Sequence, residues 1–182
     1  NKVDARFPVQ TVLRPQSEEF RDYRGYAGRM ASGVLRKGDE VTVMPSGFTS
    51  KIKSIDTFSG EVEEAFAPMS VSITLEDDID ISRGDMIVRS NNKPEAQQDI
   101  EVMLCWLNNS PAKPRAKYTI KQTSNEQKAM VKEVLYKIDI NTLNRSSDDT
   151  EMSMNDICKV KIRTTKPLMV DPYRENRTTG SI

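Results

Sequence analysis

Short segments that alternate between apolar and polar residues run along most of the chain and predict β-strands. Residues 71–75 alternate as VSITL, and residues 158–163 alternate as CKVKIR. Alternation puts successive side chains on opposite faces of a strand, so both segments are expected to be half-buried strands. Further strands are predicted at residues 7–13, 29–35, 41–43, 51–58, 86–88, 100–107, 116–120, 130–140 and 168–170. No amphipathic helical pattern accompanies them, which predicts an all-β protein.

Glycines separate the short apolar stretches between residues 20 and 47. They are Gly25, Gly28, Gly33, Gly38 and Gly47. Glycine adopts positive φ angles and allows close approach of two backbones, both of which suit the bends of a small closed barrel. These glycines are therefore expected to shape the backbone rather than to bind phosphate.

Length and one polar segment predict two tandem small β-barrels. The chain has 182 residues, and residues 90–98, SNNKPEAQQ, form a polar, proline-containing stretch that is expected to be a linker. We assign residues 1–92 to the first barrel and 93–182 to the second. Residues 100–107, IEVMLCWL, are apolar on both faces apart from Glu101, which predicts a central strand whose Trp106 anchors the second core.

Charge and cysteine content exclude several classes of protein. The chain carries 27 Lys and Arg against 27 Asp and Glu; residues 1–92 hold 12 and 15, and residues 93–182 hold 15 and 12. Neither half is a polybasic nucleic-acid binder by bulk charge. Two distant cysteines suit a reducing cytoplasm, and no segment has the length of a membrane span or the core of a signal peptide. The abrupt start without Met suggests a piece of a longer protein.

The sequence offers no catalytic constellation. It contains no His, which excludes Ser-His-Asp and Cys-His arrangements within the chain. Cys105 lies in an apolar strand and is expected to be inert, and the acidic residues 76–80 lack the spacing of a calcium loop, which favours a solvated turn. Residues 1–4, NKVD, match a guanine-recognition pattern, but no phosphate loop accompanies it. We therefore predict no catalytic, cofactor-binding or metal-ligating residues.

Two basic groups were weighed as RNA-binding surfaces. The first comprises Arg21, Arg24, Arg29, Arg36 and Lys37 with Tyr23 and Tyr26 interleaved, and the second is the stripe Lys159, Lys161 and Arg163. Aromatic rings beside arginines can stack on bases. Neighbouring acidic residues dilute the first group, which favours a solvated or subunit-facing surface. The stripe fits equally well the outward face of a strand, and nucleic acid is not an expected partner.

Six ordered segments carry a family resemblance. They are RFPVQ at 6–10, DYRGYAG at 22–28, SGVLRKGDEVTVMPSG at 32–47, EEAFAPMSVSITLEDDIDISRGDMI at 63–87, LYKIDINTL at 135–143 and DPYRENRTTGSI at 171–182. Together they resemble the large subunit of bacterial sulfate adenylyltransferase. The resemblance extends from Arg6 to the end of the chain.

The resemblance implies a fold and a function. This subunit is similar to elongation factor Tu, in which a GTPase domain precedes two β-barrels, domains 2 and 3, and the present chain would be those barrels. GTP and Mg²⁺ would bind the absent upstream GTPase domain. The partner would be the small catalytic subunit, which makes adenosine 5′-phosphosulfate and pyrophosphate from ATP and sulfate with the help of GTP hydrolysis. The barrels would act as scaffold and coupling element.

Two departures from the family pattern stand out. After residues 118–121 the family usually shows a His-Gly-Thr-like segment, whereas this chain has Gln122, Thr123 and Ser124. The chain also ends at Ile182, where family members continue into further strands. We therefore expect the second barrel to be incomplete at its C-terminal end.

Interface candidates are Arg24 and Tyr26 in the first barrel and Arg174 and Arg177 in the second, because planar donors on exposed turns suit subunit interfaces. The alternative for residues 171–177 is local salt bridges that close the barrel. Two other functions stay open at this point: barrels of a translation GTPase that contact tRNA or ribosome, and a stand-alone interaction barrel.

Overall fold

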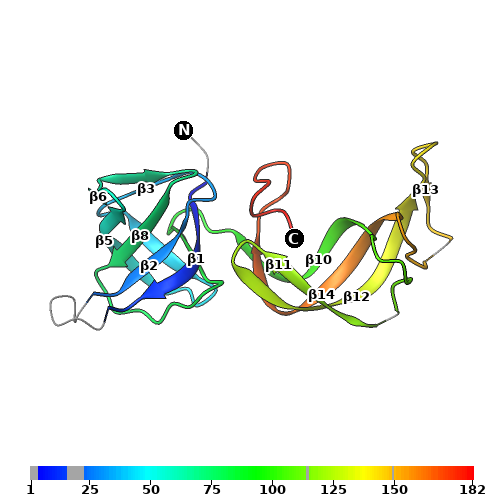
Figure 1. The fold of residues 1–182 in the computed structure, drawn as a ribbon, viewed down its shortest axis with the longest axis horizontal. Coiled ribbons are helices and arrows are strands. Elements are labelled where there is room, and N and C mark those ends of the chain that lie inside the picture. The colour runs from blue at the N-terminus through cyan, green and yellow to red at the C-terminus, as the bar shows by residue number, and fades with distance from the viewer. Residues whose placement is uncertain (1–3, 16–22, 114, 149) are drawn as a thin grey trace. The chain divides into compact units, whose positions relative to one another are not determined.

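The computed structural model describes residues 4–15, 23–113, 115–148 and 150–182, and it is built from strands and turns (Figure 1). Those residues contain fourteen strands and no helix. The prediction of an all-β protein is confirmed. Residues 1–3 of the NKVD segment and Arg21 of the first basic group lie outside the described residues.

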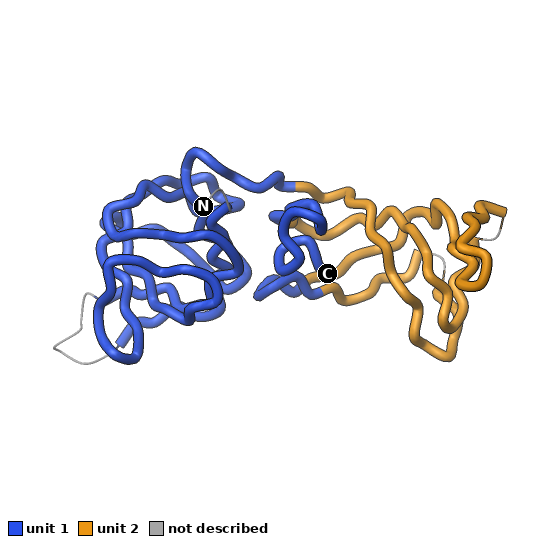
Figure 2. Tube along the Cα trace, turned by 90° about the horizontal axis from the view of Figure 1, so that it is seen from above, with its two compact units in different colours: residues 1–96, 121–126, 169–182 blue, residues 97–120, 127–168 orange. Residues whose placement is uncertain are grey.

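The chain divides into two compact units (Figure 2). The first unit contains residues 1–96, 121–126 and 169–182, and the second contains residues 97–120 and 127–168. The first unit therefore includes two segments from the second half of the sequence. The boundary between residues 92 and 93 concerns the two barrels rather than these units and stays a prediction.

The sheet of the first unit closes on itself. Its strands follow the order β4-β9-β1-β2-β8-β5-β6, and β4 also pairs with β5. Their bounds are β1 (Arg6–Leu13), β2 (Gly25–Arg29), β4 (Glu40–Met44), β5 (Thr49–Thr57), β6 (Gly60–Glu61), β8 (Ser70–Leu75) and β9 (Met86–Arg89). β3 (Val34–Arg36) and β7 (Glu64–Phe66) form a separate two-stranded antiparallel ribbon. Closure by antiparallel pairing leaves the apolar faces of the strands inside.

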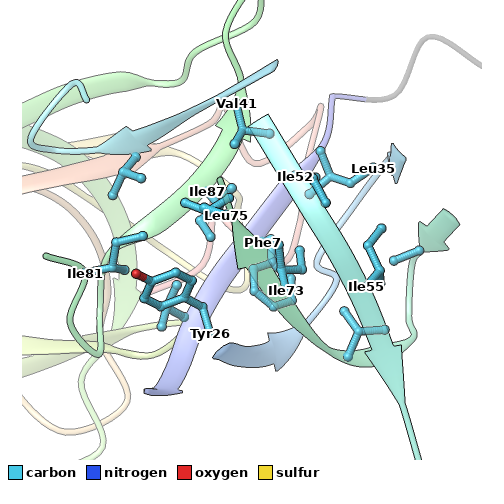
Figure 3. Packing of buried hydrophobic residues seen from close by; sticks show 14 of the residues in the cluster. Phe7, Tyr26, Leu35, Val41, Ile52, Ile55, Ile73, Leu75, Ile81 and Ile87 are labelled. Carbon is cyan, nitrogen blue, oxygen red and sulfur yellow. The ribbon is translucent and has the colours of Figure 1, made fainter. Parts of the chain in front are cut away.

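The core of this barrel is formed by the inward residues of the alternating strands. Phe7, Tyr26 and Ile73 are each at most 1% exposed, and Figure 3 shows them among the packed side chains. Burying a side chain of this size contributes about 1.5 to 3 kcal/mol. β1 and β2 approach closely at Gly28, where a Cβ would lie 2.4 Å from the Pro8 carbonyl oxygen. Glycine is required there because any side chain would collide with backbone.

The sheet of the second unit follows an open path. Its order is β10-β14-β12-β11, with β13 paired to β12. The strands are β10 (Glu95–Cys105), β11 (Lys117–Gln122), β12 (Asn125–Ile138), β13 (Arg145–Ser146) and β14 (Ile157–Val170). All of them except β13 have two end residues that belong to segments of the first unit. β12 and β14 form the long antiparallel centre. Cys158, Val160 and Ile162 of β14 are buried, as their alternation predicts.

Three expectations need correction. Residues 29–35 are not one strand, because β2 ends at Arg29 and Gly33 has a φ of 68° before β3 begins. The expected linker is shorter than residues 90–98, since β10 begins at Glu95, and the side chain of Gln98 donates to the Thr164 carbonyl at 2.8 Å.

β10 is an edge strand rather than a central one, so the expectation for residues 100–107 is wrong. Met103 and Leu107 are 49% and 72% exposed, and Cys105 is exposed rather than buried. An apolar run indicates a strand but carries no information on how many neighbours it has. Trp106 is only half-buried, and its ring meets that of Tyr118 edge-on at 5.3 Å.

Candidate interface and coupling site

Arg24, the first predicted interface residue, forms a corner with acidic residues of the first unit. Its guanidinium pairs with Asp78 and, at 3.1 Å, with Asp80, and lies 5.9 Å from the centre of the Tyr26 ring. Burial by itself lowers the pKa of Arg24, but the hydrogen bond and the charge of Asp78 outweigh that effect and the pKa is raised. Part of the acidic run at residues 76–80 thus serves as counterion to Arg24.

Tyr26 lies in β2 and not on an exposed turn, so that expectation is wrong. The residue is 1% exposed, and its hydroxyl donates to the Ile79 carbonyl at 2.8 Å. Burial raises the pKa of the phenol above its ordinary value. β2 turns this ring inward because its alternate positions face the core, and a buried hydroxyl needs a partner such as that carbonyl.

Arg174 and Arg177 lie on exposed turns of residues 171–182, as predicted. This segment, which we call the tail, folds tightly upon itself at Gly180. A Cβ there would lie 2.6 Å from the Cα of Tyr173, so glycine is needed. Whether Arg24, Tyr26, Arg174 and Arg177 act at an interface stays a prediction.

A buried ion pair joins the tail to the start of β1. The Arg6 Nε donates to Asp171 Oδ2 at 3.0 Å, and Arg6 Nη2 donates to Asp171 Oδ1 at 2.9 Å. Arg6 is 1% exposed. The planar guanidinium matches the two carboxylate oxygens in a two-pronged pair, which fixes direction as well as distance. We call this pair the Arg6–Asp171 clamp.

The remaining hydrogen-bonding groups of the clamp are also satisfied. Arg6 Nη1 donates to the carbonyl of Asn92 at 2.9 Å and to that of Ala5 at 3.1 Å. The Thr179 hydroxyl donates to Asp171 Oδ2 at 2.6 Å. A buried charge is stable only when its partners are this complete. Replacing Asp171 would leave the Arg6 charge only the Asp4 carboxylate, whose Oδ2 lies 3.3 Å from Arg6 Nη2, and replacing Arg6 would leave the Asp171 carboxylate without the Arg6 cation.

Gln122 fastens the tail at a second point. Its side-chain nitrogen donates to the Met169 carbonyl at 2.7 Å and to the Thr179 carbonyl at 2.6 Å, and the residue is 2% exposed. This is the place where the chain departs from the His-Gly-Thr-like segment. A carboxamide nitrogen has two hydrogens to donate, so one side chain serves both carbonyls. Met169 itself packs against Met86 and Val88 of β9.

A hollow of about 310 Å³ lies beside the tail within the first unit. Its polar lining comes from Gln10, Arg29, Thr123, Ser124 and Thr178, and no carboxylate, His or Cys is among the described residues that line it. Among the residues that the structure describes, no group of three His, Cys, Asp or Glu side chains could hold a metal ion. The hollow therefore offers neither a metal-ligand set nor an acid–base pair.

The two basic groups carry acidic partners. In the first group, Arg36 pairs with Glu64 at 3.1 Å and Lys37 pairs with Glu61 at 2.5 Å, in addition to Arg24 with its aspartates. In the stripe, Lys159 pairs with Glu101 at 2.7 Å. Paired cations attract a phosphate backbone less strongly than free ones do.

The clamp and the double contact of Gln122 were not predicted. Arg6 and Asp171 lie in two of the motif segments but 165 residues apart, and one sequence carries no signal that pairs them. The available hint was local: an arginine between Ala5 and Phe7 at the start of an apolar strand needs a buried counterion.

Comparisons with known proteins give the family context. Residues 26–88 match the family model Elongation factor Tu domain 2, and residues 99–182 match GTP-eEF1A C-terminal domain-like. No helix in the described part of the chain has the length and apolar character needed to cross a membrane. A solved structure of Sup35 with GDP matches with a TM-score of 0.86 at 14% identity, over 97% of this chain and 43% of its own. A structure of elongation factor SelB from Methanococcus maripaludis matches with a TM-score of 0.69 at 16% identity, over 94% of this chain and 36% of its own. At that identity the likeness shows the fold alone.

Curated relatives are much closer in sequence. The bifunctional enzyme CysN/CysC of Mycobacterium tuberculosis is 47% identical over 100% of this chain and 30% of its own length. Sulfate adenylyltransferase subunit 1 of Bacteroides fragilis is 46% identical over 100% of this chain and 37% of its own length. The chain thus spans about a third of these relatives. The resemblance that the six motifs predicted is confirmed: from end to end the chain is similar to proteins named sulfate adenylyltransferase subunit 1, and its two parts match the family models Elongation factor Tu domain 2 and GTP-eEF1A C-terminal domain-like.

Proposed function

We propose that this chain is the two-barrel region of the large subunit of a GTP-dependent sulfate adenylyltransferase, and that it serves as scaffold and coupling element without catalysis of its own. One observation carries the proposal: relatives named as this subunit or as CysN/CysC are 43–47% identical over 100% of the chain. The family match to translation-GTPase barrels agrees with it.

In this proposal the chemistry belongs to other parts of the assembly. The small subunit joins ATP and sulfate to form adenosine 5′-phosphosulfate and pyrophosphate, in the cytoplasm. GTP and Mg²⁺ bind a GTPase domain of the same polypeptide outside these residues. The absence of His from the sequence and of a metal-ligand cluster from the described residues supports a non-catalytic role.

The Arg6–Asp171 clamp is the element that we assign to coupling. A ligand shifts an equilibrium only through different contacts in two states, so a domain that transmits such a shift must resist internal deformation. The two-pronged buried pair and the Gln122 contacts give the first unit that resistance at its tail. A displacement imposed by the GTPase domain would then pass through the barrel rather than be absorbed in it.

The test uses the intact large subunit with its small subunit. Asp171→Asn is expected to leave GTP hydrolysis within about twofold of wild type and to lower GTP-stimulated synthesis of adenosine 5′-phosphosulfate at least about tenfold, because the coupling contact is weakened. Glu64→Gln, which removes an exposed partner of Arg36, is the matched control and should change neither rate. Circular dichroism establishes that both variants fold.

Two results would contradict the proposal. The first is an Asp171→Asn enzyme with normal coupling. The second is turnover of ATP and sulfate by residues 1–182 alone. Failure of purified residues 1–182 to bind the small subunit or to compete with the intact large subunit would also count against the scaffold role.

The translation-factor alternative is supported by the fold shared with Sup35 and SelB. It predicts RNA binding that weakens steeply between 50 and 200 mM salt, because phosphate contacts release counterions. The acidic partners of Arg24, Arg36 and Lys37 argue against such binding. Fluorescence anisotropy with a labelled tRNA at both salt concentrations decides, and we expect no specific complex.

A further inference from the structure

An exposed apolar tip ends the hairpin between β12 and β13 in the second unit. Ile140 and Leu143 are 64% and 76% exposed, and they lie in the turn at residues 139–144. Two large aliphatic side chains on one short turn form a small apolar protrusion. We call it the Ile140–Leu143 tip.

The turn that carries the tip is held in one conformation by Asp139. The backbone N–H groups of Asn141 and Thr142 donate to Asp139 Oδ1 at 2.8 and 3.0 Å. The N–H of Leu143 donates to the Asp139 carbonyl at 2.8 Å, and the N–H of Asp139 donates to the Asn144 carbonyl at 3.0 Å. A turn that is already ordered loses little conformational entropy when it binds a partner.

Leu143 is an unusual residue for its backbone conformation. Its φ angle is 58°, in the left-handed region where bulky side chains are rare and Asn or Gly is preferred. The side chain gains little burial in return, since it is 76% exposed. Neither the backbone nor the packing of this chain explains a leucine here, whereas contact with another molecule would.

Charged side chains at the base of the tip have partners within the chain. Lys137 pairs with Asp156 at 2.9 Å, and the Arg145 guanidinium lies 4.8 Å from the centre of the Tyr136 ring. The Asp139 carboxylate accepts backbone N–H groups. An end that presents two aliphatic side chains complements an apolar pocket of a protein rather than a phosphate backbone.

These observations lead to one partner, on the basis of the proposed function. We propose that the Ile140–Leu143 tip inserts into an uncharged apolar pocket on the small, nucleotidyl-transferring subunit. The name of these relatives, subunit 1, implies that such assemblies contain a second subunit. Two exposed aliphatic side chains beside the polar Asn141, Thr142 and Asn144 give an apolar centre with a polar rim, the arrangement found at protein interfaces.

The decisive variant is Leu143→Asn in the intact large subunit. Asparagine accepts a positive φ, so the variant is expected to unfold at the same or a higher temperature than wild type. It lacks the aliphatic anchor, so its Kd for the small subunit, measured by isothermal titration calorimetry, should rise at least about tenfold. The double variant Ile140→Ser, Leu143→Asn should raise Kd at least about a hundredfold.

Phe48→Ser is the matched control, since Phe48 is 62% exposed on the connection between β4 and β5. Its Kd should stay within about twofold of wild type. If wild type binds the small subunit and Leu143→Asn binds equally well, the tip proposal is overturned while the proposed function stands. If wild type does not bind at all, the proposed function fails.

Two further outcomes also overturn the tip proposal. One is a loss of folding stability in Leu143→Asn, which would make the leucine structural. The other is loss of self-association in the variant, seen by sedimentation velocity, with binding to the small subunit intact. That result would make a second copy of the large subunit the occupant.

Discussion

The two units of this chain use the same strand pattern and reach different depths of burial. In the first unit β4 pairs with β5 and the sheet closes, so Ile73 is 0% exposed. In the second unit the sheet path runs from β10 to β11, and Met103 on its edge strand is 49% exposed. Alternation therefore specifies a strand, while the place of the strand in its sheet decides how much of its apolar face becomes core: Val160 of β14, which lies between β10 and β12, is 0% exposed.

Polar groups follow the same division. The first unit buries an arginine completely and gives it a full set of acceptors, as in the Arg6–Asp171 clamp. Among the described ion pairs of the second unit, Glu101–Lys159 is exposed and Lys137–Asp156 is partly buried, and none is buried as deeply as the clamp. Buried pairs are costly to break and surface pairs are worth little, so electrostatic changes should affect stability mainly in the first unit.

The largest effect is expected from breaking the clamp. Asp171→Asn removes the buried carboxylate partner of the Arg6 guanidinium and leaves it only the partly exposed Asp4 carboxylate, at 3.3 Å, which should lower the free energy of unfolding by up to about 3 to 5 kcal/mol. Urea denaturation followed by fluorescence measures it. Glu101→Gln in the second unit is the control and should change stability far less, because its pair with Lys159 is exposed to solvent. Equal effects of the two substitutions would remove the electrostatic distinction between the units.

The next effect compares one substitution in both sheets. Ile73→Ala in the closed barrel should cost about 2 to 5 kcal/mol, because the surrounding core cannot collapse into the cavity. Ile162 of β14 is 4% exposed in the open sheet, where neighbours have more room to relax. Ile162→Ala should therefore cost less.

Hydrogen exchange of the amides in β8 and β14 locates the two losses. A larger loss from Ile162→Ala than from Ile73→Ala would show that the open sheet is the better packed of the two, contrary to the comparison.

The sequence was informative about strands because periodicity is a local signal. Residues 71–75 and 158–163 were predicted from alternation alone, and both lie in strands with the predicted faces buried. The position of residues 100–107 at an edge was not predictable, since strand neighbours are set by distant segments. The predicted strand at residues 29–35 ran through Gly33, because that glycine was expected to allow a bend and not to separate two strands.

The candidate site was less predictable than the fold. Arg174 and Arg177 were correctly expected on exposed turns, but Tyr26 was expected there too and is buried. An aromatic residue beside an arginine fits a surface patch and a barrel core equally well. The clamp depends on a contact between residues 165 positions apart, and no local pattern encodes such a contact.

A smaller effect concerns the exposed arginine corner of the first unit. Asp78→Asn removes one partner of Arg24, whereas Asp80 and the Tyr26 ring remain. Because Asp78 is 81% exposed, the loss should stay below about 1 kcal/mol. Thermal unfolding of Asp78→Asn, measured alongside Asp171→Asn, checks this prediction. A loss as large as that of the clamp variant would place the corner among the buried networks of the first unit.

The smallest effect is a difference between two carboxylates of the second unit. Hydrogen bonds from the backbone of Thr142 and Asn141 lower the pKa of Asp139, and the hydrogen bond and charge of Lys159 lower that of Glu101. A lowered pKa in the folded state means that each carboxylate stabilises the fold above its unfolded pKa and loses that contribution as the pH falls through its folded pKa. This stabilising contribution is therefore lost only at acidic pH, below the ordinary pKa values of 3.8 for Asp139 and 4.5 for Glu101.

Carboxyl NMR titration of the two groups separates backbone from ionic stabilisation. Lys159→Met should return the pKa of Glu101 toward its ordinary value and leave that of Asp139 unchanged, because no side-chain cation holds Asp139. High salt should likewise raise the pKa of Glu101 more than that of Asp139, since mobile ions screen an exposed ion pair. A parallel response of both groups to salt would mean that charge, and not the backbone of the turn, orders the residues beneath the Ile140–Leu143 tip.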